Sequence, residues 1–400
     1  MTILPTQAPT AAVPRLKAVD LARRTLALIE TRSTDQADRV MQLPADLYLD
    51  ADHFNHERET LFRSGPVFAG FSAELAAPGR YKALDLPGAP VILARQTDGT
   101  LRAFVNACQH RGARLVDGAG TTEAFTCPYH AWCYGLDGRL VSMKAGTSFG
   151  SVDPECASLA GIDAAEEHGL MFIRGCAGSH DLRHLDVTTV LGEELADQLR
   201  QFHFGDLELV ASRAFESRAN WKLVLDTQLE THHIATLHPT TLAMRHYSDH
   251  TTFDAYGRHG LIGLAHKSIG ALAGVAEDDW DPIEHVQFIY NLFPNAVVLV
   301  ASTHVEYVQV FPGASAASAR TVHAYFVPPG GRGPGDERHG ERAERSFRTL
   351  VDEDGPMAEN VQHNIAAGVV DRILVGRNEP AVQHQYLTYD AMLQLTGGTP

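Results

Sequence analysis

CQHRGARL (residues 108–115) and CPYHAWCYGLDGRL (residues 127–140) are the two segments that decide how this chain folds. The first places Cys108 two residues before His110, and the second places Cys127 three residues before His130. Thiolate and imidazole groups are preferred ligands of transition metals such as zinc and iron. Four such side chains in two short segments predict a metal centre held between two loops.

Two kinds of metal centre accept two cysteines and two histidines. Zinc binds this set in a tetrahedron, and a Rieske [2Fe–2S] cluster binds it with two cysteines on one iron and two histidines on the other. Here each segment carries one Cys and one His, so each loop can give one ligand to each iron, whereas the common zinc patterns place two Cys before two His. The spacing therefore favours the iron–sulfur cluster over zinc, and over two unrelated pairs on loops. Neutral imidazoles raise the reduction potential, so the cluster can accept an electron and pass it on.

Glycines outline the domain around this centre. Between Gly79 and Gly138 they separate short apolar stretches such as 90–93 and 102–105, a rhythm typical of an all-β domain with tight turns. We expect this domain to cover residues 46–165.

The remaining sequence predicts a leader and a second domain, which makes the chain α+β. Residues 1–45 are expected to form an N-terminal leader and a helix, and the first 14 residues lack the basic start and apolar stretch of a signal peptide. Residues 166–400 are expected to combine long helices with an antiparallel sheet. Its predicted strands are 286–290, 296–301, 305–311 and 321–327.

A second group of metal-ligand residues lies in NWKLVLDTQLETHHIATLHP (residues 220–239). We expect one long helix over 221–237. Asp226, Glu230 and His233 are spaced i, i+4, i+7 and would share one face of that helix.

His238 follows His233 by five residues, about 140° around an ideal helix, so the helix must be distorted or end there. Two histidines and one carboxylate form the facial triad of non-haem Fe(II) oxygenases. From the residues alone, a solvated helix face is the more ordinary interpretation, and the adjacent His232 could replace His233 as the ligand.

The third ligand would come from VDEDGPMAENVQHN (residues 351–364), which offers Asp352, Glu353 and Asp354. Gly355-Pro356 is a typical helix start. The ordinary role of an acid there is to cap the helix, and the residues alone favour the cap.

Charge and composition exclude several classes of partner. The 400 residues contain 33 Lys and Arg against 49 Asp and Glu, a net charge of −16, whereas nucleic acids and anionic membranes require a basic face. No apolar run approaches about 18 residues. The five cysteines are an odd number, and two of them belong to the ligand motifs, so we expect a cytoplasmic protein rather than a disulfide framework.

The ligand segments resemble those of the Rieske non-haem iron oxygenases, in their catalytic α subunits. The resemblance covers residues 46–386 and rests on the two loops quoted first, on Asn-Trp-Lys…Glu-x-x-His-x₄-His-Pro, and on Asp354 with Glu359 and Gln362 after it. VGRNEPAVQHQY (375–386) also looks like the family's C-terminal helix segment. The resemblance implies a Rieske domain followed by a helix-grip domain.

The resemblance also assigns the site residues. Cys108, His110, Cys127 and His130 would hold the cluster. His233, His238 and Asp354 would hold a mononuclear Fe(II). Glu230 would link the two centres, between His130 of one subunit and His233 or His238 of the next. Many relatives have Asp at that position, and an aromatic residue is typical at the position of His232.

The resemblance implies that the chain is an O2-dependent mono- or dioxygenase. Electrons from NAD(P)H would arrive through a separate reductase, with or without a ferredoxin, because the chain has no GxGxxG motif after a strand. A homotrimer is expected. The reaction would be hydroxylation, dihydroxylation or oxidative demethylation of a small aromatic or amine substrate. Two alternatives are a Rieske electron carrier with a non-catalytic second domain and a zinc-stabilised ligand-binding module.

The substrate pocket is expected among residues 242–247, 286–293 and 297–307. Aromatic side chains in these segments could stack on an aromatic substrate or fill the core. They are Phe288, Tyr290, Phe293 and Tyr307.

Overall fold

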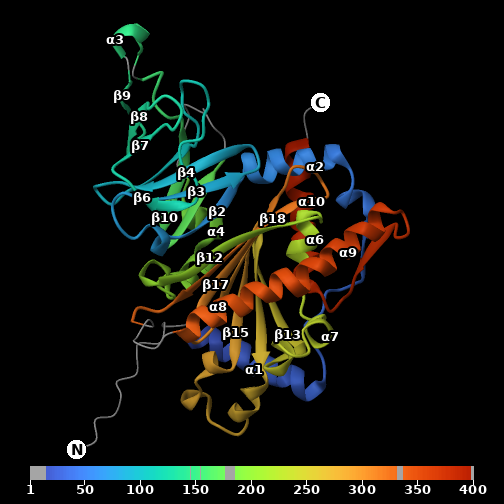
Figure 1. Cartoon of the computed structure of the whole chain (residues 1–400). Coiled ribbons are helices and arrows are strands. Elements are labelled where there is room, and N and C mark those ends of the chain that lie inside the picture. Colours follow the sequence, from blue (N-terminus) through green and yellow to red (C-terminus); the bar gives the residue numbers. More distant parts are fainter. Residues whose placement is uncertain (1–14, 145, 154, 176–184, 331–336, 398–400) are drawn as a thin grey trace, which may run out of the picture. The chain divides into compact units, whose positions relative to one another are not determined.

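The computed structural model describes the chain except residues 1–14, 145, 154, 176–184, 331–336 and 398–400. Its residues form two compact units: Glu57–Val190, and Met1–His56 together with Leu191–Pro400. The first unit is built of β-strands and the second of an antiparallel sheet with helices (Figure 1). The predicted α+β fold class is confirmed.

The unit of residues 57–190 contains an antiparallel sheet in the order β2-β11-β10-β5-β4-β3-β6 and a small sheet β7-β8-β9. Its core packs Ile92, Phe104, Phe125 and Tyr134 between these strands. The strands of the larger sheet are β2 (Pro66–Phe71), β3 (Arg80–Leu86), β4 (Ala89–Arg95), β5 (Leu101–Val105), β6 (Ala119–Thr121), β10 (Gly161–Glu167) and β11 (Leu170–Arg174). Those of the smaller sheet are β7 (Ala124–Thr126), β8 (Cys133–Gly135) and β9 (Leu140–Ser142), and short helices are η2 (Arg58–Arg63), η3 (Ser72–Leu75), α3 (Gly146–Phe149) and α4 (Val187–Leu191).

The other unit is organised by an antiparallel sheet in the order β12-β18-β17-β16-β15-β14-β13. The four strands predicted from the sequence are confirmed as β15 to β18, and three more complete the sheet. The strands are β12 (Glu208–Ser217), β13 (His246–Tyr256), β14 (His259–His266), β15 (Val286–Leu292), β16 (Ala296–Val300), β17 (Val305–Pro312) and β18 (Ala319–Val327). A separate pair joins β1 (Met41–Pro44) to β19 (Arg372–Val375).

Helices cover this second sheet (Figure 1). Helix α6 packs on β17 and β18, α8 on β12 and β18, and α1 on β13 and β14, while α9 lies beside α6. The α-helices and the π-helical segment η9 are α1 (Arg15–Thr31), α2 (Ala51–Glu57), α5 (Glu193–Arg200), α6 (Trp221–Asp226), α7 (Ile234–Leu237), α8 (Glu337–Thr349), η9 (Leu350–Asp354), α9 (Gly355–Ala366) and α10 (Pro380–Gly397). Short 3-10 helices are η1 (Ala45–Tyr48), η4 (Phe204–Asp206), η5 (Leu242–Met244), η6 (Lys267–Leu272), η7 (Glu277–Asp279) and η8 (Pro282–Glu284).

One predicted element is wrong. The single helix expected over 221–237 is two short helices, α6 and α7, with a non-helical link from Thr227 to His233. Inside the link, Glu230 accepts hydrogen bonds from the backbone N–H groups of His232 (2.7 Å) and His233 (3.3 Å). A carboxylate that binds backbone N–H groups offers the chain an alternative to helical hydrogen bonds, so the break falls there.

The boundaries of the two compact units differ from the predicted domain bounds of 46–165 and 166–400. Strand β11 pairs with β2 and β10, which keeps residues 170–174 in the first unit. Helix α1 packs against strands of the second unit. The leader predicted over the first 14 residues lies outside the described residues. Among the helices that the structure describes, none has both the length and the apolar character needed to cross a membrane.

Candidate metal centres and cavity

The four predicted cluster ligands lie on two tight loops of the first unit. Cys108 and Cys127 are buried, and Tyr134 places its hydroxyl 3.2 Å from the Cys108 sulfur. The rings of His110 and His130 are 4.6 Å apart between centroids. Each loop is closed by backbone hydrogen bonds, from Cys108 N–H to the Ala113 carbonyl (2.8 Å) in one and from Cys127 N–H to the Trp132 carbonyl (2.7 Å) in the other.

The donor atoms of these loops fit a metal cluster. The Nδ1 atoms of His110 and His130 are buried and have no hydrogen-bond partner among the described residues. Buried polar nitrogens without a partner are costly, and two of them beside two cysteines are what a cluster with two Cys and two His ligands requires. Although burial raises the pKa of Cys127, hydrogen bonds from the N–H groups of His130 and Tyr129 and a hydrogen bond with Cys108 outweigh it, so the pKa is lowered. A lowered pKa favours the thiolate that binds metal.

Three predicted iron ligands come together in the second unit. His233, His238 and Asp354 each offer one ligand atom, and these atoms lie within 4.8 Å of one another. The Asp354 Oδ1 atom is 3.1 Å from Nε2 of His238 and 3.7 Å from Nε2 of His233. The link after α6 supplies His233, the end of α7 supplies His238, and the end of η9 supplies Asp354.

Two further carboxylates orient the imidazoles. Glu230 hydrogen-bonds Nδ1 of His233, and Glu353 accepts from Nδ1 of His238 at 2.6 Å. In a neutral histidine the proton is then on Nδ1, so both Nε2 lone pairs face the Asp354 oxygen. Either a proton on Nε2 of His238, shared with Asp354, or a metal ion bound between the three atoms relieves the repulsion of their lone pairs, so this arrangement fits a metal ion.

These contacts shift the pKa values of Glu230 and His238 in opposite directions. Burial opposes ionisation of Glu230, but its hydrogen bonds to His233 and to the neighbouring backbone N–H groups lower its pKa. Burial likewise opposes protonation of His238, but hydrogen bonds to Asp354 and Glu353 raise its pKa.

The geometry argues against two alternatives: His232 as an iron ligand, and Asp354 as a helix cap. His232 points elsewhere: its Nε2 atom is 2.9 Å from the Asn378 carbonyl and its Nδ1 atom is 3.3 Å from Asp249. Asp354 precedes α9 but makes no side-chain capping bond. The residues that follow it fix its position, because Gln362 accepts from the Asn220 N–H (2.8 Å) and thereby ties α9 to α6.

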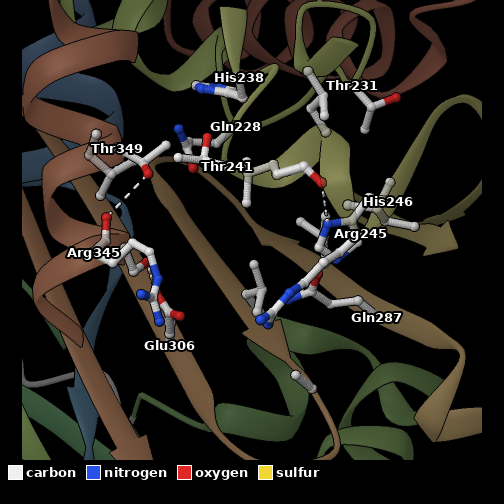
Figure 2. Close-up of a pocket in the computed structure, with 18 of the residues that line it drawn as sticks. Gln228, Thr231, His238, Thr241, Arg245, His246, Gln287, Glu306, Arg345 and Thr349 are labelled. Atoms are coloured by element: carbon white, nitrogen blue, oxygen red, sulfur yellow. Dashed lines mark hydrogen bonds between the residues drawn. The ribbon is translucent and has the colours of Figure 1, made fainter. Parts of the chain in front are cut away.

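A cavity of about 640 Å³ is lined by all three converging ligands, of which Figure 2 shows His238. One side is formed by the sheet and is largely apolar: Leu264, Ile289, Val297, Leu299 and Val308 line it, with Gln287 and Glu306 on the same face. Further polar lining groups include His246 and His304. A volume of this size takes a small organic molecule.

The aromatic residues expected to line this cavity belong to the core instead. Gln287 and Ile289 line the cavity, so Phe288 and Tyr290, which alternate with them along β15, point to the other face of the sheet. There both rings pack on Phe202, at 6.1 and 5.8 Å between centroids. In β17 the same alternation turns Tyr307 away from the cavity, where its ring centroid is 5.8 Å from that of Phe326. Phe293 packs on Tyr389, at 5.4 Å between ring centroids.

Asp226, four residues before Glu230, is a half-buried acid whose role the sequence left open. Burial raises the pKa of Asp226 to about 7, even though the Tyr386 hydroxyl donates to its carboxylate (2.8 Å). Tyr386 is in turn 2.8 Å from the Tyr48 hydroxyl. Asp226 therefore titrates near neutral pH inside a small hydrogen-bonded chain, and does not line the cavity.

We predict that Asp226→Asn changes how stability depends on pH. Because the folded-state pKa is raised from 3.8 to about 7, the protonated carboxyl stabilises the wild type at low pH, and this contribution is lost as the pH rises through 7. The Asn variant should gain stability relative to wild type between pH 5 and pH 8, by at most about 3 kcal/mol, since about two pH units of that range lie below the folded-state pKa. Urea midpoints at both pH values measure this, and an equal difference at the two would contradict it.

Comparison with known proteins agrees with both sites. Residues 65–153 match the model of the Rieske [2Fe–2S] domain, and residues 204–395 match that of the ring hydroxylating alpha subunit (catalytic domain). The first contains the four cluster ligands and the second contains the three converging residues. The two matched domains imply a Rieske cluster and a mononuclear iron.

Among curated proteins, the oxygenase subunit of carnitine monooxygenase from Escherichia coli (strain K12) is 33% identical over 215 residues, 54% of this chain and 55% of that protein. The anthranilate 1,2-dioxygenase large subunit from Acinetobacter baylyi is 30% identical over 269 residues, 65% of this chain and 56% of that protein. The chain thus spans about half the length of the curated relatives it matches. A solved structure of a quaternary ammonium Rieske monooxygenase with an inhibitor has a TM-score of 0.75 at 23% identity, covers 93% of this chain and 98% of its own, and shows the shared fold.

Proposed function

Since this chain belongs to the Rieske non-haem iron oxygenases, with the catalytic domain of the ring-hydroxylating alpha subunits, we propose that it is the O2-activating oxygenase component of a multi-component enzyme. The observation that carries the proposal is the convergence of His233, His238 and Asp354 in the lining of a cavity large enough for a substrate. An electron carrier would have no need of such a cavity beside its ligand set.

The proposed division of roles follows from the donor atoms. Cys108, Cys127, His110 and His130 would hold a Rieske cluster. The three converging residues would hold a mononuclear Fe(II). When bound, the cluster would supply single electrons. The Fe(II) would supply the site of O2 and substrate chemistry, because three protein ligands leave positions on it open.

The residues around the iron ligands have defined tasks. Glu230 fixes the ring of His233 and Glu353 fixes the ring of His238, each by accepting from Nδ1, so that both Nε2 atoms stay aimed at one point. Such partners orient the ring and select the tautomer that binds metal. The apolar side of the cavity removes water from the substrate and holds it beside the iron ligands.

We further propose that electrons come from NAD(P)H through a separate reductase, with or without a ferredoxin, and that the active form is a homotrimer. In it, Glu230 would lie between His130 of one subunit and His233 or His238 of the next. A cytoplasmic location is proposed because Cys133 and Cys156, the described cysteines outside the proposed cluster ligands, form no disulfide, as is usual in a reducing compartment.

The substrate is proposed to be a small organic molecule that undergoes hydroxylation, dihydroxylation or oxidative demethylation. The names of the relatives, which include a carnitine monooxygenase and an anthranilate 1,2-dioxygenase, support this range of reactions and substrates.

Oxygen consumption tests the proposed function. The iron-loaded protein, given a surrogate reductase and NADH, should take up O2 in proportion to an added substrate and form an oxygenated product. His238→Ala should take up none beyond the reductase alone, because it lacks a ligand of the proposed iron. Turnover that is unchanged in His238→Ala would contradict the proposal.

A further inference from the structure

We propose that the cavity recognises the carboxylate of a small organic acid through Arg245, Arg342 and Arg345 at its rim, while the apolar body of the acid points toward the iron ligands. This inference deepens the proposed function, since the acid it identifies would be the substrate. All three arginines line the cavity.

The three arginines lack a counter-charge. In the part of the chain that the structure describes, none of them forms an ion pair with a carboxylate within 4.0 Å. Arg348, on the same helix as Arg345, does pair, with Glu344 (3.0 Å) and Asp352 (3.6 Å). Three arginines that line one cavity without a carboxylate partner among the described residues are unusual in a chain with net charge −16, and their guanidinium groups can each bind an anionic group of a ligand.

The position of the arginines suits one ligand group. Arg245 and Arg345 are exposed and project from opposite walls of the cavity (Figure 2). Arg342 is half-buried, one turn before Arg345 on α8. The guanidinium group binds a carboxylate through two parallel hydrogen bonds.

Three of the four acids that line the same cavity already have hydrogen-bond partners other than the arginines. Glu306 is buried and already accepts from Nε2 of His323 (2.6 Å), from the Ser346 hydroxyl, and from Nε2 of His304 (3.0 Å). Glu230 and Asp354 are held by histidines of the proposed iron site. Of the lining carboxylates, this leaves Glu284 against the three arginines.

The residues that line the cavity also disfavour a cationic substrate. Recognition of a quaternary ammonium group uses the faces of several aromatic rings, but Phe288, Tyr290 and Tyr307 point away from this cavity. Among the lining residues, the one Phe, Tyr or Trp is Tyr325, and its ring is stacked on His304 at 4.7 Å between centroids. An organic anion with an apolar body matches both kinds of lining group, the arginines and the aliphatic side chains.

Matched acid and amide probes test the inference. Calorimetric titration of the iron-loaded protein with benzoate against benzamide, and hexanoate against hexanamide, should show the acid of at least one pair binding about tenfold tighter or more, because a charged hydrogen-bond pair is lost in the amide. Arg345→Gln should remove most of this preference and leave amide binding within about twofold. Higher salt should weaken acid binding more than amide binding.

Arg348→Gln is the matched control, because it removes the same group three residues further along the same helix but outside the cavity. It should keep the preference for the acid. If no pair shows a preference, or if Arg348→Gln lowers it as much as Arg345→Gln does, the inference is overturned. Titration needs no turnover: a preference that depends on Arg345 without acid-dependent O2 uptake would keep the binding site and reject the proposed oxygenase activity.

Discussion

An Asp354→Ala variant is expected to bind roughly one iron fewer per chain, to keep the cluster, and to lose substrate oxidation. Asp354 is the only carboxylate in the proposed three-ligand set, and its Oδ1 atom is the point at which the two imidazoles converge. Without it, two histidines alone would face a cavity and would hold Fe(II) weakly. Iron and acid-labile sulfide analysis, together with O2 uptake, measure both effects.

Asp352→Ala is the matched control for that experiment. Asp352 lies two residues earlier in the same acidic run, is exposed, and pairs with Arg348 rather than with a histidine. It should retain iron and activity. An Asp354→Ala protein with unchanged iron content and turnover would show that the metal, if any, is held elsewhere.

Glu230→Gln is expected to leave both metal centres occupied and yet to reduce product formation by roughly two orders of magnitude or more. The amide keeps an oxygen that can accept from the backbone N–H groups of His232 and His233, so the link between α6 and α7 should stay folded. It loses the negative charge that holds the proton on Nδ1 of His233 and that is proposed to couple this ring to a cluster ligand of the next subunit.

Stopped-flow absorbance separates this effect from simple loss of iron. In Glu230→Gln the cluster should be reduced at a normal rate but reoxidised by O2 and substrate slowly. Glu353→Gln is the comparison, because Glu353 holds His238 in the same manner. It should weaken iron binding by roughly 10–100-fold and respond to added Fe(II). If Glu230→Gln turned over normally, or were rescued by Fe(II) alone, the proposed link between the centres would be wrong.

The cluster-ligand residues could be predicted because their residue types and their short spacing in the sequence are characteristic of metal ligands. Cys108, His110, Cys127 and His130 lie on two loops that are close together in the sequence, so a short pattern contains the whole set. The strands β15 to β18 were predictable for a similar reason, since each is a short segment rich in aliphatic and aromatic residues that favour strands.

Other parts of the site depend on contacts between distant segments. The break between α6 and α7 arises where Glu230 turns back on its own backbone, and helix periodicity gives no sign of it. Glu353 was an obvious acid, but its contact with His238 spans 115 residues. The face on which Phe288 and Tyr290 lie depends on which side of the sheet faces the cavity, and an all-buried strand carries no alternation that reveals this.

The central claim is that one chain holds a Rieske cluster and a separate iron, and elemental analysis with EPR spectroscopy tests it most directly. We expect protein purified anaerobically to contain about three irons and about two acid-labile sulfides per chain, with a Rieske-type signal after reduction by dithionite. Zinc in place of iron, with no sulfide, would contradict the account, because Cys108, His110, Cys127 and His130 would then form a structural zinc site with no electron to deliver.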